Sequence, residues 1–268
     1  EEFWLKTYRV DTLVAPSLRH SVNTMGCGAG RGLVAAKDKD APFLAEYFVE
    51  LGKLMEEMDK IDPMKMLFDP EEAKRVQEMQ EAHKERLKPW IHMSFDKHDH
   101  NKDGSLDRAE AQEFFNHYTR LFIAFHKKYD VMLLKSQMAK EAVFAQGRIA
   151  EMFDASMQVE LKALMKAQEA AAITELQKRL KTKRENYLAN KAALDEEAFN
   201  CLDTSTDGKV QRQELVEAFM FESERNDEVH LALGLLEADE AHAVANAKKL
   251  GETMQGAGAE GDSDCQMQ

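Results

Sequence analysis

The 179 residues that follow Pro89 contain no proline. Proline interrupts helices because it lacks a backbone N–H and its ring clashes with the preceding turn. The same stretch is rich in Ala, Glu, Lys, Leu, Gln and Met, which have high helix propensities. We therefore expect an almost entirely α-helical (all-α) protein.

The composition limits what these helices can do. Apolar residues make up 44% of the 268 residues, which is enough to build a core for one or two domains. The formal charge of −13 argues against general nucleic-acid binding and favours either the binding of cations or simply solubility. The three cysteines are odd in number and far apart, which predicts no disulfide framework and favours the reducing cytoplasm. No run approaches the roughly 18 apolar residues that span a bilayer, so any membrane attachment would be made in another way.

Oxygen-bearing side chains alternate along residues 99–110, "DHNKDGSLDRAE", which we call loop one. Carboxylates this close repel one another unless a cation lies between them. A calcium loop needs oxygen ligands at positions 1, 3, 5, 7, 9 and 12 and a glycine at position 6. The ligand positions of loop one hold Asp99, Asn101, Asp103, Ser105, Asp107 and Glu110, and Gly104 lies at the sharp turn. We expect Ser105 to bind through its main-chain carbonyl, Asp107 directly or through water, and Glu110 through both carboxylate oxygens.

A second copy of this pattern is "DTSTDGKVQRQE", residues 203–214, which we call loop two. Its ligand positions hold Asp203, Ser205, Asp207, Lys209, Gln211 and Glu214, with Gly208 at position 6. Lys209 is compatible with a cation site because position 7 binds through the main-chain carbonyl, and we expect its side chain to point into solvent. Loop one offers four carboxylates and loop two three. We therefore predict two Ca²⁺ sites, the first of sensor affinity, roughly 10⁻⁷ to 10⁻⁵ M, and the second weaker.

Both segments resemble the EF-hands of the calmodulin superfamily. The resemblance rests on the filled ligand positions, the glycines, the apolar flanking helices and the apolar residue at position 8, Leu106 or Val210. It covers the two helix–loop–helix units, roughly a quarter of the chain. It implies that a short strand at position 8 pairs one loop with another. A metal-free hand kept for packing is the alternative for either loop.

The separation of the two loops departs from the family pattern, in which paired hands are joined by a short linker. Asp99 and Asp203 are 104 residues apart. One straight helix over residues 111–198 would be about 130 Å long and would prevent pairing within the chain. We expect the segment to fold back near Gly147 and to bring Leu106 to Val210. The alternatives are pairing with a degenerate partner or with another chain.

Prolines, glycines and charge divide the rest of the chain. We predict an N-terminal linker or upstream segment (1–40), a helical region (41–88), a first EF-hand (89–120), a long helical insertion of the coiled-coil kind (121–193), a second EF-hand (194–224) and an acidic, helical to disordered tail (225–268). Pro42 opens an amphipathic helix whose apolar stripe is more typical of packed core than of a partner-binding face. Asp69 is the expected N-cap of the next helix, with Pro70 first in it, and Pro89 is expected to end it. The basic residues between Leu161 and Lys191 are more typical of a solvated helix face that pairs with acidic surface elsewhere than of a patch that binds lipid or calmodulin.

The segment "MGCGAGRG" begins at Met25, the first methionine of the chain. At a true N-terminus it would present Gly26 for myristoylation and Cys27 for palmitoylation, which together would anchor the protein to the cytoplasmic face of a membrane. Gly30 stands where that motif prefers Ser or Thr. The alternative is a flexible glycine-rich linker inside a longer chain.

Other constellations are weaker. His92, His98 and His100 lie near loop one, but no fourth ligand accompanies them, and we interpret them as surface histidines. The sequence contains no nucleophile elbow, phosphate-binding glycine loop or zinc-protease motif, so we expect no enzymatic activity.

The main hypothesis is therefore a cytoplasmic calcium sensor or regulator that acts on an unidentified protein target. The alternatives are a helical scaffold with calcium-stabilised ends, a calcium buffer, or the non-catalytic calcium module of a larger enzyme.

Overall fold

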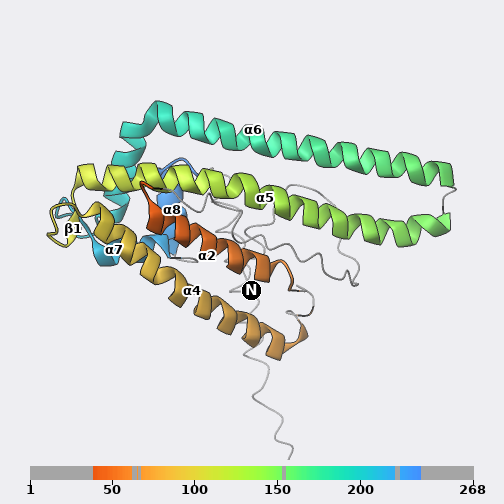
Figure 1. The fold of residues 1–268 in the computed structure, drawn as a ribbon, viewed down its shortest axis with the longest axis horizontal. Coiled ribbons are helices and arrows are strands. Elements are labelled where there is room, and N and C mark those ends of the chain that lie inside the picture. Colours follow the sequence, from red (N-terminus) through yellow and green to blue (C-terminus); the bar gives the residue numbers. More distant parts are fainter. Residues whose placement is uncertain (1–38, 62–64, 66–67, 153–154, 221–223, 237–268) are drawn as a thin grey trace, which may run out of the picture.

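The computed structural model describes residues 39–61, 65, 68–152, 155–220 and 224–236, and within them the protein is almost entirely helical (Figure 1). The helices are α2 (Pro42–Met58), α4 (Pro70–His98), α5 (Arg108–Met152), α6 (Ala155–Leu202), α7 (Arg212–Phe219) and α8 (Glu224–Ala232). The two strands are β1 (Ser105–Leu106) and β2 (Val210–Gln211). The all-α prediction is confirmed. In the described residues no helix is long and apolar enough to cross a bilayer.

The longest helices, α5 and α6, form an antiparallel hairpin (Figure 1). α5 ends at Met152 and α6 begins at Ala155, so the predicted fold-back occurs. The fold-back lies near Gly147, as predicted, but not at it, because α5 is helical through this residue and ends at Met152. One glycine inside a helix costs only about 1 kcal/mol, which packing along a 45-residue helix can offset.

The fold-back pairs the two loops. β1 and β2 are antiparallel, with Ser105 opposite Gln211 and Leu106 opposite Val210. Leu106 and Val210 are fully buried. The predicted contact between these two residues is confirmed, and the straight rod is excluded.

A kink in α6 directs its last residues toward the loops. Asn190 has non-helical backbone angles, φ −115° and ψ 15°. Its side-chain amide donates hydrogen bonds to the main-chain carbonyl of Asn186, at 3.1 Å, and to the Asn186 side-chain oxygen, at 2.8 Å. The final three turns of α6 therefore enter loop two at a different angle from the rest of the helix, as Figure 1 shows.

α4 corrects the prediction that Pro89 ends a helix. Asp69 caps the helix as predicted, accepting hydrogen bonds from the backbone N–H groups of Glu71 and Glu72, and Pro70 follows it. The helix then continues through Pro89 to His98. Pro89 and Glu85, whose carbonyl loses its helical partner, lie on the exposed side, where water can satisfy that carbonyl. Leu87 and Ile91 on the opposite side are fully buried and keep the helix in place.

The core lies where α2 covers the paired units. The Phe48 ring lies 5.3 Å from Tyr118 and 5.5 Å from Phe125, measured between ring centroids. Tyr47 donates a 2.9 Å hydrogen bond to the carbonyl of Phe219 in α7. The apolar stripe of α2 is thus packed core, as predicted. α8 packs on α6 and α7, and its His230 accepts a 2.8 Å hydrogen bond from the Tyr118 hydroxyl.

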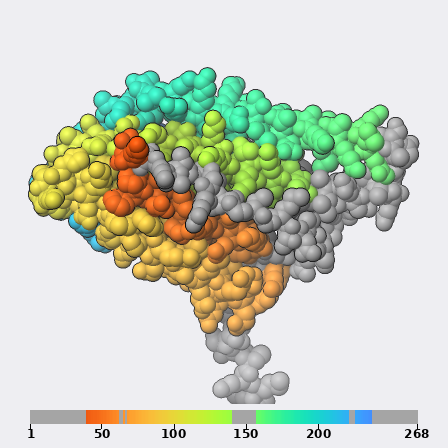
Figure 2. All heavy atoms as spheres, viewed as in Figure 1, coloured from red at the N-terminus to blue at the C-terminus, as the bar shows by residue number. Residues whose placement is uncertain are grey.

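The molecule is elongated in the direction of the hairpin. In the space-filling view α6 forms one edge and α4 the opposite edge (Figure 2). The two loops lie together at one end, as the ribbon in Figure 1 shows. Gly26, Cys27 and the predicted disordered end of the chain lie outside the described residues.

Candidate metal centre

Loops one and two adopt the same backbone conformation. In each, the residue at position 4 and the glycine at position 6 have positive φ: 58° at Lys102 and 84° at Gly104, against 55° at Thr206 and 81° at Gly208. The glycines were expected from the sequence, because this region of φ is open to them without steric cost. Position 4 was not, because Lys and Thr carry no signal for a left-handed backbone.

In loop one the first and last acidic residues converge. Asp99 is 5% and Glu110 6% exposed. Asp99 accepts hydrogen bonds from the backbone N–H groups of Asp103, at 3.2 Å, and Gly104, at 3.0 Å. Glu110 reaches back from the first turn of α5, and its Oε1 accepts from the His100 N–H at 2.8 Å. The 12-residue segment is therefore closed into a ring by its two buried carboxylates.

The remaining predicted ligands of loop one lie on the same ring. The Asn101 side-chain oxygen accepts from the Asp103 N–H at 2.8 Å, and Asp103 accepts from the Ser105 hydroxyl at 2.6 Å. The Asp107 carboxylate accepts from the Glu110 N–H at 2.9 Å. Glu110 Oε2 in turn accepts from the Asp107 N–H at 3.0 Å, so these two residues cap the start of α5 reciprocally.

Loop two repeats this ring. Asp203 and Glu214 are each 8% exposed. Asp203 accepts from the Gly208 N–H at 2.9 Å and from the Ser205 hydroxyl at 3.2 Å. Glu214 accepts from the Ser205 N–H at 3.1 Å and from the Thr204 hydroxyl at 2.6 Å.

The later positions of loop two also contribute to its ring. Gln211 donates a 3.0 Å side-chain hydrogen bond to Asp207, and its N–H donates to Glu214 at 2.8 Å. The residues at all six predicted positions of each loop therefore lie close together within that loop.

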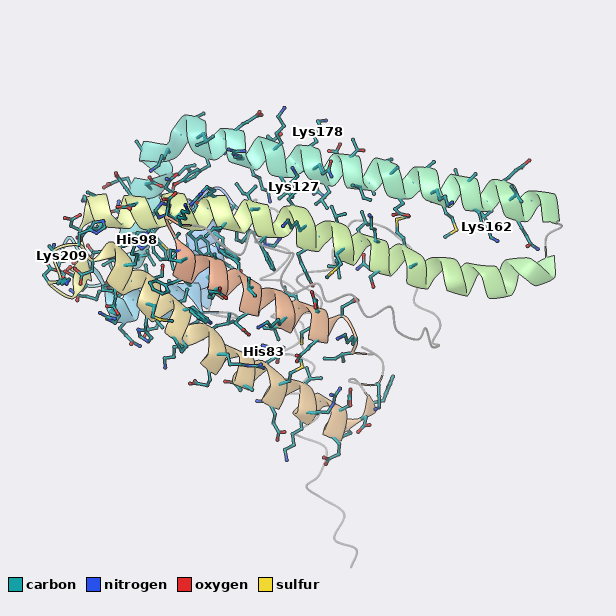
Figure 3. The ribbon with its side chains drawn as sticks, viewed as in Figure 1. His83, His98, Lys127, Lys162, Lys178 and Lys209 are labelled. Carbon is teal, nitrogen blue, oxygen red and sulfur yellow. The ribbon has the colours of Figure 1, made fainter. Side chains whose placement is uncertain are left out.

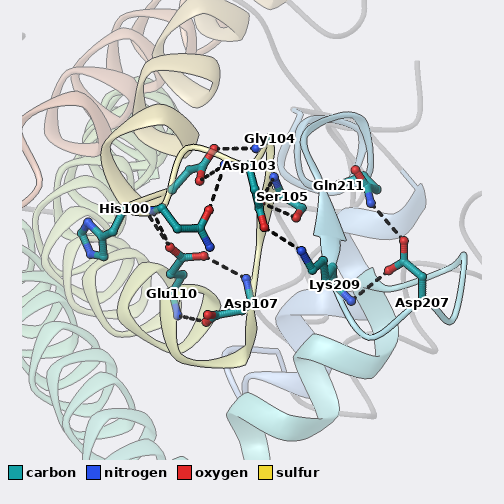
Figure 4. A network of polar contacts seen from close by, with 11 residues as sticks. His100, Asp103, Gly104, Ser105, Asp107, Glu110, Asp207, Lys209 and Gln211 are labelled. Atoms are coloured by element: carbon teal, nitrogen blue, oxygen red, sulfur yellow. Dashed lines mark hydrogen bonds and ion pairs between the residues drawn. The ribbon is translucent and has the colours of Figure 1, made fainter.

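Lys209 contradicts the expectation that its side chain points into solvent. Its ammonium group crosses from loop two to loop one and donates a 2.6 Å hydrogen bond to Asp103, as Figure 4 shows. This hydrogen bond, with those from Ser105, lowers the pKa of the Asp103 carboxyl to about 2. The physical reason is the β1–β2 pairing, which brings loop two against loop one, so that the long Lys209 side chain reaches the position 5 carboxylate of loop one.

Two arginines that the sequence did not single out fasten the units to each other. Arg108 and Arg212 both stand at position 10 of their loops. The guanidinium of Arg108 lies 4.5 Å from the ring centre of Phe199, and that of Arg212 lies 4.6 Å from Phe95. Each ring belongs to the helix that enters the other loop, four residues before its first ligand. Each arginine also forms an ion pair with that helix: Arg108 with Glu196, and Arg212 with Asp96. The sequence signal that could have identified these two arginines is their shared place at position 10 of both loops.

The donor chemistry fits a hard divalent cation. Ca²⁺ takes six to eight oxygen ligands, and each loop carries carboxylate oxygens together with an amide or hydroxyl oxygen at its ligand positions. Buried ionised carboxylates are costly without a positive partner or several donors. Asp99, Glu110, Asp203 and Glu214 are buried at the positions where such a cation would neutralise them.

The fold around β1 and β2 is a pair of helix–loop–helix units: α4, loop one and α5, and the end of α6, loop two and α7. Comparison with known families matches residues 194–220, the whole of the second unit, to the EF hand. The chain thus carries an EF hand, as the sequence pattern predicted, and this match indicates calcium binding. Comparison with curated proteins and with solved structures gave no match.

The histidines near loop one differ from the prediction in one respect. His98 is not a surface residue: it is 1% exposed and its Nδ1–H donates a 2.7 Å hydrogen bond to the Ser94 carbonyl. Burial lowers the pKa of His98. His92 is half-buried, and His100 is exposed and donates to Glu113.

Proposed function

We propose that the protein is a calcium-binding regulatory protein in which loops one and two form a pair of EF-hand sites. The observation that carries this proposal is the shared geometry of the two loops. In both, a buried position 12 glutamate reaches back to the start of the loop, and positions 4 and 6 have positive φ. The family match covers loop two alone. Loop one is assigned by its likeness to loop two and by its six oxygen-bearing positions.

We propose that the site in loop one is the tighter of the two. Its four carboxylates, Asp99, Asp103, Asp107 and Glu110, support this ranking, since each negative ligand strengthens the attraction for a divalent cation. The Lys209 ammonium works against it, because a cation that recruits Asp103 must displace an existing positive partner.

A sensor role is supported by what covers the apolar face of the pair. Calcium binding to sensor EF-hands changes the angle between the entering and leaving helices and exposes an apolar groove. Here α2 packs against both α4 and α5, with Phe48 on Tyr118. A change in the angle between α4 and α5 would disrupt the packing of α2 against these helices and would expose the rings of Phe48 and Tyr118. An apolar segment of a target protein would then be the partner.

Calcium titration with circular dichroism and an apolar-surface dye tests this function. We expect dye fluorescence to rise with calcium while helix content is kept. A Glu110→Gln, Glu214→Gln double variant is the matched control, because it keeps the shape of both glutamates and removes their charge. Native mass spectrometry of the same two proteins counts the bound ions. A bare polypeptide in millimolar calcium contradicts calcium binding, and bound ions without a dye response indicate a buffer or scaffold.

The second candidate, a helical scaffold, is favoured by the α5–α6 hairpin. α6 presents exposed apolar side chains along it, with Val159 67% and Leu164 55% exposed. Small-angle X-ray scattering with and without calcium separates the two functions. A scaffold keeps the same elongated profile, whereas a sensor changes its profile as α2 moves.

We also propose a cytoplasmic location, supported by Cys201, which is a half-buried free thiol. Acylation at Gly26 and Cys27 stays a prediction, and mass spectrometry of the native N-terminus tests it.

A further inference from the structure

A second kind of cation site lies beside loop one. Three potential ligands, His98, Glu113 and His117, place one ligand atom each within 4.8 Å of one another. His98 is the last residue of α4, and Glu113 and His117 lie one turn apart on α5. Figure 3 shows His98 at the end of the molecule that carries the loops, where α4 approaches α5.

His98 is already oriented as metal-binding histidines are. Such histidines donate their second ring N–H to a carbonyl or carboxylate, which settles the tautomer and aims the other nitrogen at the metal. His98 donates its Nδ1–H to the Ser94 carbonyl at 2.7 Å, so its Nε2 carries a lone pair. The ring is held edge to face against Phe114, with centroids 5.4 Å apart. Burial and packing thus keep this lone pair aimed at α5.

The second ligand, His117, faces the Nε2 atom of His98. His98 Nε2 and His117 Nδ1 are 2.9 Å apart, a hydrogen bond in which His117 donates. Two nitrogens on a tetrahedral zinc lie about 3.3 Å apart, given Zn–N distances of about 2.0 to 2.1 Å. A small outward movement of His117 therefore suffices. When His117 binds zinc through Nδ1, the proton of Nδ1 is replaced by one on Nε2, so the imidazole stays neutral.

Glu113 supplies a carboxylate, and its outer partner is also in place. His100 donates a 2.9 Å hydrogen bond to Glu113 Oε2. Both side chains are about half exposed, 46% for Glu113 and 54% for His100, so the site opens to solvent on this side.

We propose that His98, Glu113 and His117 form a zinc site distinct from the calcium loops, with His100 orienting Glu113 and water in the fourth position. Two imidazoles and one carboxylate suit zinc, whereas calcium prefers oxygen ligands alone. The three proposed ligands lie outside both calcium loops, and only the orienting residue, His100, belongs to loop one, at position 2. The zinc site therefore has a ligand set separate from that of the proposed calcium function. It joins the helices that enter and leave loop one.

Binding of Co²⁺ and Zn²⁺ to the full chain in saturating calcium tests the proposal, because calcium then competes for the carboxylates of the loops. We expect one Co²⁺ per chain with the visible absorption of a tetrahedral ion, displaced by Zn²⁺. Glu113→Gln and His117→Gln should each weaken Zn²⁺ binding about 10- to 100-fold or more. His92→Gln, a half-buried histidine of α4 outside the cluster, is the matched control and should leave binding unchanged.

Thermal unfolding of each variant without metal verifies that the fold is intact. Zn²⁺ should raise the unfolding temperature of the parent protein and of His92→Gln, and not that of Glu113→Gln or His117→Gln. Equal Zn²⁺ affinity in the parent and in folded His117→Gln and Glu113→Gln overturns the proposal. An octahedral Co²⁺ spectrum overturns it as well.

Discussion

Loops one and two share a backbone and differ in charge. Both bury the acidic residues at positions 1 and 12, and both turn at a glycine with φ above 80°. Loop one carries four carboxylates, whereas loop two carries three and a lysine. The ammonium group of that lysine, Lys209, pairs with Asp103 of loop one and not with a carboxylate of loop two. The electrostatics of one loop therefore depend on its neighbour, so counting the charges of each loop separately is incomplete.

The largest difference between the loops is expected from their last ligands. Glu110→Gln should weaken calcium binding at loop one on the order of 100-fold and leave loop two near its parent affinity, and Glu214→Gln should do the reverse. The glutamine side chain has nearly the same shape as glutamate but carries no charge. The backbone N–H groups of Gly104 and Gly208, which donate to Asp99 and Asp203, allow NMR to follow each loop separately. If either variant changes both loops equally, the sites are not independent.

The reciprocal arginines test whether the pair is symmetric. Arg108→Met and Arg212→Met should each lower the free energy of unfolding by about 1 kcal/mol, because each loses an ion pair and a cation–π contact to the other unit. Urea unfolding in the presence of a chelator measures this. Arg86→Met, in an exposed part of α4, controls for the loss of a charge. A large effect of one substitution and no effect of the other would show that the two arginines do not stabilise the pair of units equally.

The smallest effect is expected at the contact between the loops. Lys209→Gln should strengthen calcium binding at loop one about two- to fivefold, since the ion pair with Asp103 is partly exposed and screened. Loop two should change less, because position 7 binds through its main-chain carbonyl. Lys102→Gln removes the same charge from loop one itself, at an exposed position, and serves as the control. Titration followed at Gly104 measures the change, and weaker binding in Lys209→Gln would show that the lysine does not compete with calcium.

Local patterns predicted much of this molecule. The caps and turns depend on neighbours within a few residues, so Asp69, Gly104 and Gly208 were found from sequence. The pairing of Leu106 with Val210 followed from burial, since an apolar strand edge left in water is costly. Pro89 and Gly147 were overestimated as breaks, because packing of a long helix outweighs one unfavourable residue.

Contacts between distant segments could not be predicted. Arg108 and Arg212 resembled ordinary surface residues, because their aromatic partners are 91 and 117 residues away along the chain. The sequence also predicts a surface position for His98, which is wrong because Phe114 and His117, which pack against it, come from α5.

The helical character of the chain and the positions of the two 12-residue loops can be derived from sequence, because helix propensity and ligand spacing are local properties. The contact of Lys209 with Asp103 and the meeting of His98, Glu113 and His117 follow only from the folded chain. The hairpin of α5 and α6 and the pairing of β1 with β2 set these distances, and no local pattern encodes them.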